Sequence, residues 1–253
     1  MTKPPLNAPD WLTARPIAHR GLHSGQNGII ENTKAAAIAA IDHNYAIECD
    51  VQITRDGEAV VFHDFTLDRL LNAKGRVDDL TAAELGRFSF EKGDQKILTL
   101  AAFLQAIGGR AAVIIEIKSR YDGDLRLAER AFQIADTCSG PVSLKSFDPE
   151  VLVHLRRRNA ACPLGLVAQA QYQDAEFVGL TPARRAGLSA LSDFPQAQPD
   201  FLSWNLGDLP HAVPMLCRAG IGMPVLTWTV RSPKEAAFGR RHCDQIIFEG
   251  FAP

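Results

Sequence analysis

Two carboxylates and an imidazole lie on one predicted β-hairpin, and together they would suit metal-assisted acid–base chemistry. Apolar runs flank the pair Asp56 and Gly57, which is typical of a hairpin closed by a two-residue type I′ turn. With that turn Asp50 lies opposite His63, and Glu48 shares their face because strand side chains alternate. Oxygen ligands two positions apart suit a hard cation such as Mg²⁺ or Ca²⁺, and a nearby histidine can move protons. An edge hairpin with polar residues facing water is the alternative interpretation of this stretch.

A second pair of charged residues ends a predicted strand over residues 111–118. That strand is apolar until Glu116 and Lys118, and buried charges are costly unless they are paired or bound to a metal. With Glu48 and Asp50, Glu116 would complete an oxygen-rich site that suits Mg²⁺ or Ca²⁺ and not a thiolate-binding metal. A Glu116–Lys118 pair that only caps the end of the strand is the alternative.

Cations and a second histidine indicate the ligand. Arg20 and Lys118 would lie beside the metal, where their charges suit a phosphate. His19 and His63 follow neighbouring strands, and such a pair can supply one general base and one general acid. Metal, cations and paired imidazoles together describe the cleavage of a phosphodiester.

The scaffold that must position these residues alternates between strands and helices. Main strands are expected to start near Ile17, Ile47, Val113, Val142, Leu164, Phe201, Val225 and Ile246. Helices are expected from an N-cap at Asn32 or Thr33 to about 44, then over 99–107, 125–138, 149–158, 182–191, 210–219 and 233–241, with a short one after Thr81.

Eight such units predict a TIM (β/α)8 barrel, in which active-site residues lie at the carboxyl ends of the strands. An open doubly wound sheet is the rival, but no glycine-rich nucleotide turn follows the first strand. The expected organisation is one domain over residues 1–253, with a polar insertion at approximately 66–99 after the hairpin.

Composition narrows the partners and the compartment. The formal net charge of −2 shows no basic surplus for binding nucleic acid or a membrane surface. No apolar run is long enough to cross a bilayer, and residues 1–18 lack the apolar core of a signal peptide. The 5 cysteines form no CxxC pair, which argues against zinc and disulfide frameworks and favours the cytoplasm. The oligomeric state is left open.

The motifs, taken together, resemble the glycerophosphodiester phosphodiesterase family in order and spacing along nearly the whole chain. The matching segments are Ala18-His19-Arg20-Gly21, Glu31-Asn32-Thr33, Glu48-Cys49-Asp50-Val51, Phe62-His63-Asp64 and Glu116-Ile117-Lys118. Further similar segments are Thr66-Leu67-Asp68-Arg69, Asp79-Leu80-Thr81, Ser146-Phe147 and Trp228-Thr229-Val230.

This resemblance implies a TIM barrel with the insertion on its catalytic face, and it assigns a role to each candidate residue. One divalent cation, Mg²⁺ or Ca²⁺, would be held by Glu48, Asp50 and Glu116; the acid/base pair would be His19 and His63; phosphate would contact Arg20 and Lys118; the alcohol pocket would be lined by Phe147 and Trp228. The implied reaction hydrolyses a small glycerophosphodiester to glycerol 3-phosphate and an alcohol. The nucleophile, water or the substrate's own 2-hydroxyl, is left open, as is the assignment of acid and base.

Two other functions are compatible with the same residues. A lysophospholipase D would use this machinery on a lipid and would need an apolar groove, which Leu85, Phe88 and Phe90 could supply. A non-catalytic phosphoester-binding barrel would have lost a histidine or a metal carboxylate, and none is lost here.

The chain also departs from the family pattern at three places. Ile30 stands where the family commonly has proline, and Arg231 replaces a usual asparagine. Phe248 and Glu249 end the last strand where threonine and aspartate are usual. These departures concern the alcohol side of the site.

Overall fold

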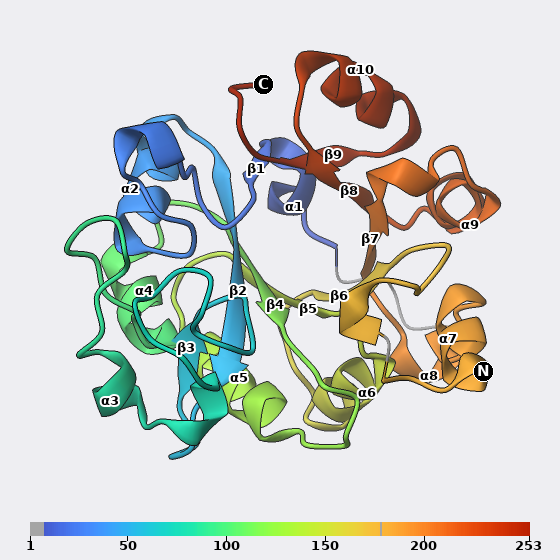
Figure 1. Cartoon of the computed structure of the whole chain (residues 1–253). Helices are drawn as coiled ribbons and strands as arrows, with labels where there is room; N and C mark the ends of the chain where they lie inside the picture. The colour runs from blue at the N-terminus through green and yellow to red at the C-terminus, as the bar shows by residue number, and fades with distance from the viewer. Residues whose placement is uncertain (1–7, 178) are drawn as a thin grey trace.

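A closed barrel of parallel strands, surrounded by helices, forms the centre of the molecule in the computed structural model, which describes residues 8–177 and 179–253 (Figure 1). The parallel strands of these ranges are β1 (Ile17–Ala18), β2 (Ala46–Ile53), β4 (Val113–Ile117), β5 (Val142–Ser146), β6 (Leu164–Ala168), β7 (Phe201–Asn205), β8 (Val225–Val230) and β9 (Gln245–Phe248). Their order is β1-β9-β8-β7-β6-β5-β4-β2, and the pairing of β1 with β2 closes the ring. The predicted TIM barrel is confirmed, and the open sheet is excluded.

The main helices lie on the outside of the barrel (Figure 1). They are α2 (Lys34–Asp42), α4 (Leu100–Ile107), α5 (Arg126–Asp136), α6 (Pro149–Arg157), α7 (Pro182–Ser189) and α10 (Pro233–His242). Several begin where a side chain accepts a hydrogen bond from the first turn, at Thr33, Thr99, Asp148, Thr181 and Ser232. The helix expected over 210–219 is α9 (Ala212–Met215), continued by a π-helical turn over Leu216–Gly220. Two short helices were not predicted, α1 (Trp11–Ala14) and α8 (Phe194–Ala197). None of the helices within the described ranges combines the length and apolarity needed to cross a bilayer.

The predicted register of the hairpin is wrong by one residue. Strand β3 (Ala59–Val61) runs antiparallel to β2, and Val51 pairs with Val61 instead of Phe62. The N–H of Phe62 donates to the carbonyl of Asp50 at 3.0 Å, so His63 is not opposite Asp50.

The loop of the hairpin explains this shift. Thr54 accepts a hydrogen bond from the N–H of Gly57 at 3.0 Å and donates its own N–H to Glu58 at 3.0 Å. Gly57 adopts a φ of 80°, which is the left-handed residue of a three-residue loop with a bulge. The Thr54 hydroxyl also donates to Asp56 at 2.6 Å. An Asp-Gly pair is compatible with this loop as well as with the expected two-residue turn.

The segment between β3 and α4 has its own apolar cluster. The buried members are Val60, Phe62, Leu67, Leu71, Val77, Leu85, Phe90 and Ile97. A capping box at Thr81 starts α3 (Ala82–Leu85), as the sequence predicts. Leu85 is 0% exposed and Phe90 3% exposed, and Phe88 packs against the same cluster. Leu85 and Phe90 are therefore core residues and do not line the groove that a lipid tail would need.

One glycine makes room for an aromatic ring inside the barrel. The ring belongs to a buried apolar cluster that includes Ile17, Ile114, Phe201, Leu226 and Ile247. Gly165 on β6 lies beside Phe201 of β7, and a Cβ added at Gly165 would lie 2.2 Å from Cζ of that ring. The ring is 0% exposed, so it has no free space to move into.

Gly165→Ala should lower the free energy of unfolding by about 1–3 kcal/mol, because the methyl group overpacks the barrel. Urea unfolding measures this. Gly220→Ala is the matched control, since an added Cβ at that helical position meets nothing within 4 Å. Equal stability of the two variants would contradict the packing argument.

Candidate active site

The predicted site residues converge on one cavity at the carboxyl ends of the strands. The cavity has a volume of about 350 Å³ and is lined by His19, Arg20, Asp50, His63, Glu116, Lys118, Phe147 and Trp228 among others. Glu48 is buried two residues before Asp50 on β2. The structure therefore brings the residues that end the predicted strands together around one cavity.

Three carboxylates form the acidic group at the base of this cavity. One oxygen from each of Glu48, Asp50 and Glu116 lies within 4.8 Å of the other two. Their exposures are 0%, 1% and 5%, so water solvates them poorly. Clustered, buried carboxylate oxygens fit the ligand preference of Mg²⁺ and Ca²⁺.

Two buried lysines lie among these carboxylates. The Lys118 ammonium is 2.6 Å from Glu116 and 3.1 Å from Asp50, and the Lys145 ammonium is 2.9 Å from Glu116 and 3.1 Å from Glu48. The sequence places Arg20 and Lys118 as the cations beside the carboxylates, but Lys145 is not among the predicted site residues. Lys145 is the penultimate residue of the buried strand β5 and pairs in register with Glu116 of β4, a pairing that the sequence alone does not show.

Each ion in this group keeps its partners charged. Burial raises the pKa of Asp50 and of Glu116, but Lys118 overcomes that effect and holds both values below their usual range. Burial lowers the pKa of Lys118 and Lys145, yet the facing carboxylates raise both values above the usual range. Asp50, Glu116, Lys118 and Lys145 are therefore charged at neutral pH.

Arg20 and Asn32, from the first two matching segments, contact the same carboxylates. The backbone N–H of Arg20 donates to Glu48 at 3.0 Å, and the side-chain Nε of Arg20 lies 3.4 Å from Asp50. The amide of Asn32 donates to Asp50 at 2.9 Å. Arg20 and Asn32 both have positive φ, 56° and 57°, and Asn tolerates this conformation well.

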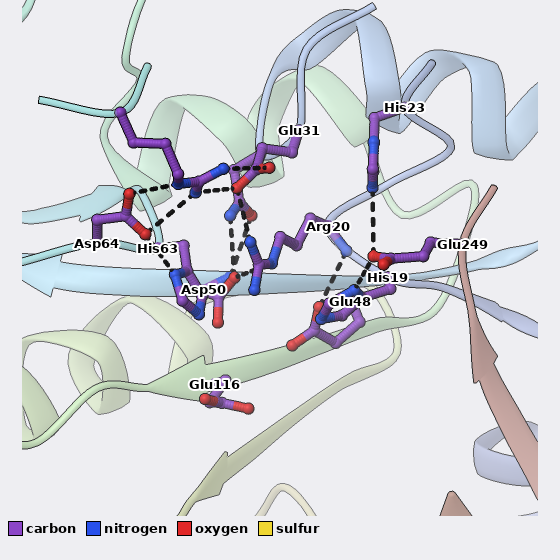
Figure 2. Close-up of polar contacts among 12 residues, drawn as sticks. His19, Arg20, His23, Glu31, Glu48, Asp50, His63, Asp64, Glu116 and Glu249 are labelled. Atoms are coloured by element: carbon purple, nitrogen blue, oxygen red, sulfur yellow. Dashed lines mark hydrogen bonds and ion pairs between the residues drawn. The ribbon is translucent and has the colours of Figure 1, made fainter. Parts of the chain in front are cut away.

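Both histidines are held by a carboxylate at Nδ1 (Figure 2). His19 Nδ1 is 2.5 Å from Glu249, and His63 Nδ1 is 2.6 Å from Asp64. A carboxylate oxygen accepts, so Nδ1 donates in each ring and Nε2 is left for other partners. Although the register is wrong, the structure does bring His63 to the cavity that holds Asp50.

A chain of ion pairs connects Asp64, the partner of His63, to Arg20, which faces the acidic group (Figure 2). Arg69 lies 2.6 Å from Asp64 and 2.6 Å from Glu31, and Glu31 lies 2.8 Å from Arg20. His63 is thereby connected through Asp64 to the guanidinium that faces the acidic group.

Aromatic rings form one wall of the cavity. Phe147 and Trp228 meet edge to face with centroids 5.4 Å apart, and Phe177 lies 5.5 Å from Phe147. Tyr172 packs on Phe177 at 4.9 Å. Phe177 and Tyr172 follow β6 in a segment without apolar periodicity, so the sequence offered no signal for them.

Two of the departures from the family pattern contact each other. Arg231 Nε donates to Glu249 at 2.8 Å, so Arg231 is not a free cation at the cavity. Ile30 contributes a backbone carbonyl that accepts a hydrogen bond from Thr33 at 2.7 Å.

Comparison with known families agrees with this geometry. The sequence model described as the glycerophosphoryl diester phosphodiesterase family matches residues 19–248, which is most of the chain. The chain belongs to this family.

Curated relatives carry the glycerophosphodiester phosphodiesterase name over shorter stretches. One from Caldanaerobacter subterraneus is 39% identical over 111 residues, covering 41% of this chain and 44% of that protein. One from Bacillus altitudinis is 38% identical over 110 residues, covering 40% of this chain and 43% of that protein. The match thus spans less than half the length of either relative.

Solved structures of phosphodiesterases share the fold. An Oleispira antarctica phosphodiesterase, solved with the product sn-glycerol-3-phosphate, has a TM-score of 0.75 at 19% identity and covers 94% of both chains. A glycerophosphodiester phosphodiesterase from Thermotoga maritima has a TM-score of 0.68 at 23% identity and covers 92% of both chains.

Asp64→Asn should make stability less sensitive to acid. Burial raises the pKa of Asp64, but hydrogen bonds from His63 and Arg69 bring it below the ordinary value of 3.8. The unfolded chain binds this proton more readily, so the stabilisation is present above about pH 4 and is lost as the pH falls through the folded-state pKa.

Urea unfolding at pH 5 and pH 3 tests this expectation. The loss of unfolding free energy between the two values should be smaller in Asp64→Asn than in the wild type. An equal loss would show that Asp64 does not contribute to the acid sensitivity. Asp68→Asn, a change at an exposed residue of the same segment, is the control.

Proposed function

We propose that this chain hydrolyses glycerophosphodiesters to glycerol 3-phosphate and an alcohol. One observation carries the proposal: two carboxylate-held imidazoles face the same cavity as a buried acidic group and its cations. Family membership and the product bound to the Oleispira protein support glycerophosphate as the substrate unit. We also infer a cytoplasmic protein, because the 5 cysteines form no CxxC pair and a reducing compartment suits them.

One divalent cation, Mg²⁺ or Ca²⁺, would be held by Glu48, Asp50 and Glu116. Their burial and the proximity of their oxygens support this assignment. When bound, the cation supplies Lewis-acid stabilisation of the phosphoryl oxygens and orients the phosphate. Lys118 contacts two of the same carboxylates, so its ammonium lies where it could also bind the phosphate.

The protein's own side chains bind the phosphate and transfer the protons. Arg20 and Lys118 bind phosphoryl oxygens and stabilise the charge that develops there. Of His19 and His63, one removes the proton from the nucleophile, which is water or the substrate's 2-hydroxyl. The other protonates the oxygen of the leaving alcohol.

The aromatic wall suits the departing alcohol. Phe147 and Trp228 line the cavity, and both rings have apolar faces. The polar residues Asn205 and Gln169 line the same cavity and hydrogen-bond to each other at 3.2 Å. Small polar alcohols therefore fit this side of the cavity.

Release of glycerol 3-phosphate from simple glycerophosphodiesters is the direct test. We expect turnover with Mg²⁺ or Ca²⁺ and loss of turnover in EDTA. Near-complete activity in EDTA would refute the metal assignment. Binding of glycerol 3-phosphate without turnover of any diester would instead favour a phosphoester-binding protein.

Asp50→Asn should reduce kcat/KM by more than about a hundredfold, because it weakens the metal site. Isothermal titration with Mg²⁺ and Ca²⁺ should show weaker binding by the variant. The variant should remain folded by circular dichroism, since Lys118 keeps Glu116 as a charged partner and asparagine keeps the shape of the side chain. Asp68→Asn provides the matched change at a residue outside the cavity.

His19→Ala and His63→Ala should each lose at least about a hundredfold in kcat, which is the usual contribution of general acid–base catalysis. The double variant should lose much less than the product of the two effects, because the histidines act as a unit. His43→Ala is the control, since His43 is an exposed residue that follows α2. Retention of most activity by either single variant would remove that histidine from the mechanism.

A further inference from the structure

The first and last strands of the barrel place His19 and Glu249 side by side. Strand β1 pairs in parallel with β9, with Ala18 beside Phe248. The N–H of His19 donates to the carbonyl of Phe248 at 2.9 Å. His19 and Glu249 are therefore the next residues on each strand, and their side chains meet at 2.5 Å between Nδ1 and Oε2.

We propose that Glu249 is a positioning residue for His19: its carboxylate fixes the imidazole in the Nδ1–H form and in one orientation, so that Nε2 is the atom that exchanges a proton with the substrate. This role rests on the proposed function. The neutral imidazole carries one proton, and whichever partner Nδ1 has decides which nitrogen holds it.

Glu249 is itself fixed by further contacts. Its Oε1 accepts a hydrogen bond from Arg231 Nε at 2.8 Å, and its Oε2 lies 3.6 Å from Nε2 of His23 (Figure 2). The backbone N–H of Arg231 in turn donates to Glu235 at 2.6 Å. Both carboxylate oxygens thus have partners, and rotation of the Glu249 side chain would break contacts with them.

The protonation state of Glu249 agrees with this role. Burial alone raises its pKa, but the hydrogen bond from His19, the nearby ring of His23 and the charge of Arg231 hold the pKa well below its usual range. An ionised carboxylate can only accept hydrogen bonds. The facing nitrogen of His19 must therefore be the donor.

A purely structural role for Glu249 makes different predictions. If the ion pairs only join β9 to β1, their removal should lower stability and leave kcat and the form of the His19 ring unchanged. A positioning role should instead lower kcat and leave KM little changed, because His19 acts in the reaction and not in binding.

Glu249→Gln is the decisive variant, because glutamine keeps the size but can offer either a donor or an acceptor to Nδ1. We expect kcat for a glycerophosphodiester to fall by about tenfold or more, within the hundredfold assigned to the histidine. Glu235→Gln is the matched control. The Glu235 carboxylate accepts a hydrogen bond from the backbone N–H of Arg231, and the variant should keep the wild-type kcat.

Nitrogen NMR of the His19 ring gives a readout that does not need turnover. The signals, assigned by their loss in His19→Ala, should show the Nδ1–H form in the wild type and a mixture of both forms in Glu249→Gln. An unchanged ring form in Glu249→Gln, or an unchanged kcat, overturns the positioning role. A wild type without any phosphodiester hydrolysis, in which the ring form still depends on Glu249, refutes the proposed function and leaves the effect of Glu249 on the ring measurable.

Discussion

The balance of buried charges at the mouth of the barrel is the constraint that the rest of the site obeys. Three carboxylates with little access to water would be costly alone, and so would two buried lysines. Lys118 and Lys145 each contact two carboxylates, so every member of the group is stabilised by at least one opposite charge. Removing one partner of such a group leaves an uncompensated buried charge, which is strongly destabilising. The site is therefore specified as a unit.

The motifs outside this group supply its remaining hydrogen bonds. Arg20 and Asn32 approach Glu48 and Asp50 through left-handed backbone conformations, which place an N–H and an amide against the carboxylates. Gly21, next along the chain, has a φ of 76°, and an added Cβ there would lie 2.8 Å from the backbone of α2. Short sequence motifs at the ends of β1 and at the start of α2 are thus explained by contacts to one acidic group.

The scaffold could be predicted from sequence because few folds accommodate an alternation of apolar strands and helices, and the strand ends indicate where the cavity lies. Contacts that depend on exact loop geometry could not be predicted from the sequence. The pair Asp56 and Gly57 fits two loop lengths, and the choice between them moved the register by one residue. Lys145 gained its partners only across neighbouring strands of the barrel. Phe177, which lines the cavity, and Tyr172, which packs on it, lie in an irregular segment where no periodicity marks them.

Closure of the barrel by β1 and β9 has a consequence for folding. His19 and Glu249 are separated by 230 positions along the chain, so their contact has one of the largest loop-closure costs in the molecule. Contacts of such high sequence separation form late, because the intervening chain must first be ordered. Glu48, Asp50 and Glu116 lie on β2 and β4, whereas His19 meets its carboxylate only where β9, the last strand, pairs with β1. Recovery of activity during refolding should consequently lag behind the recovery of helical signal.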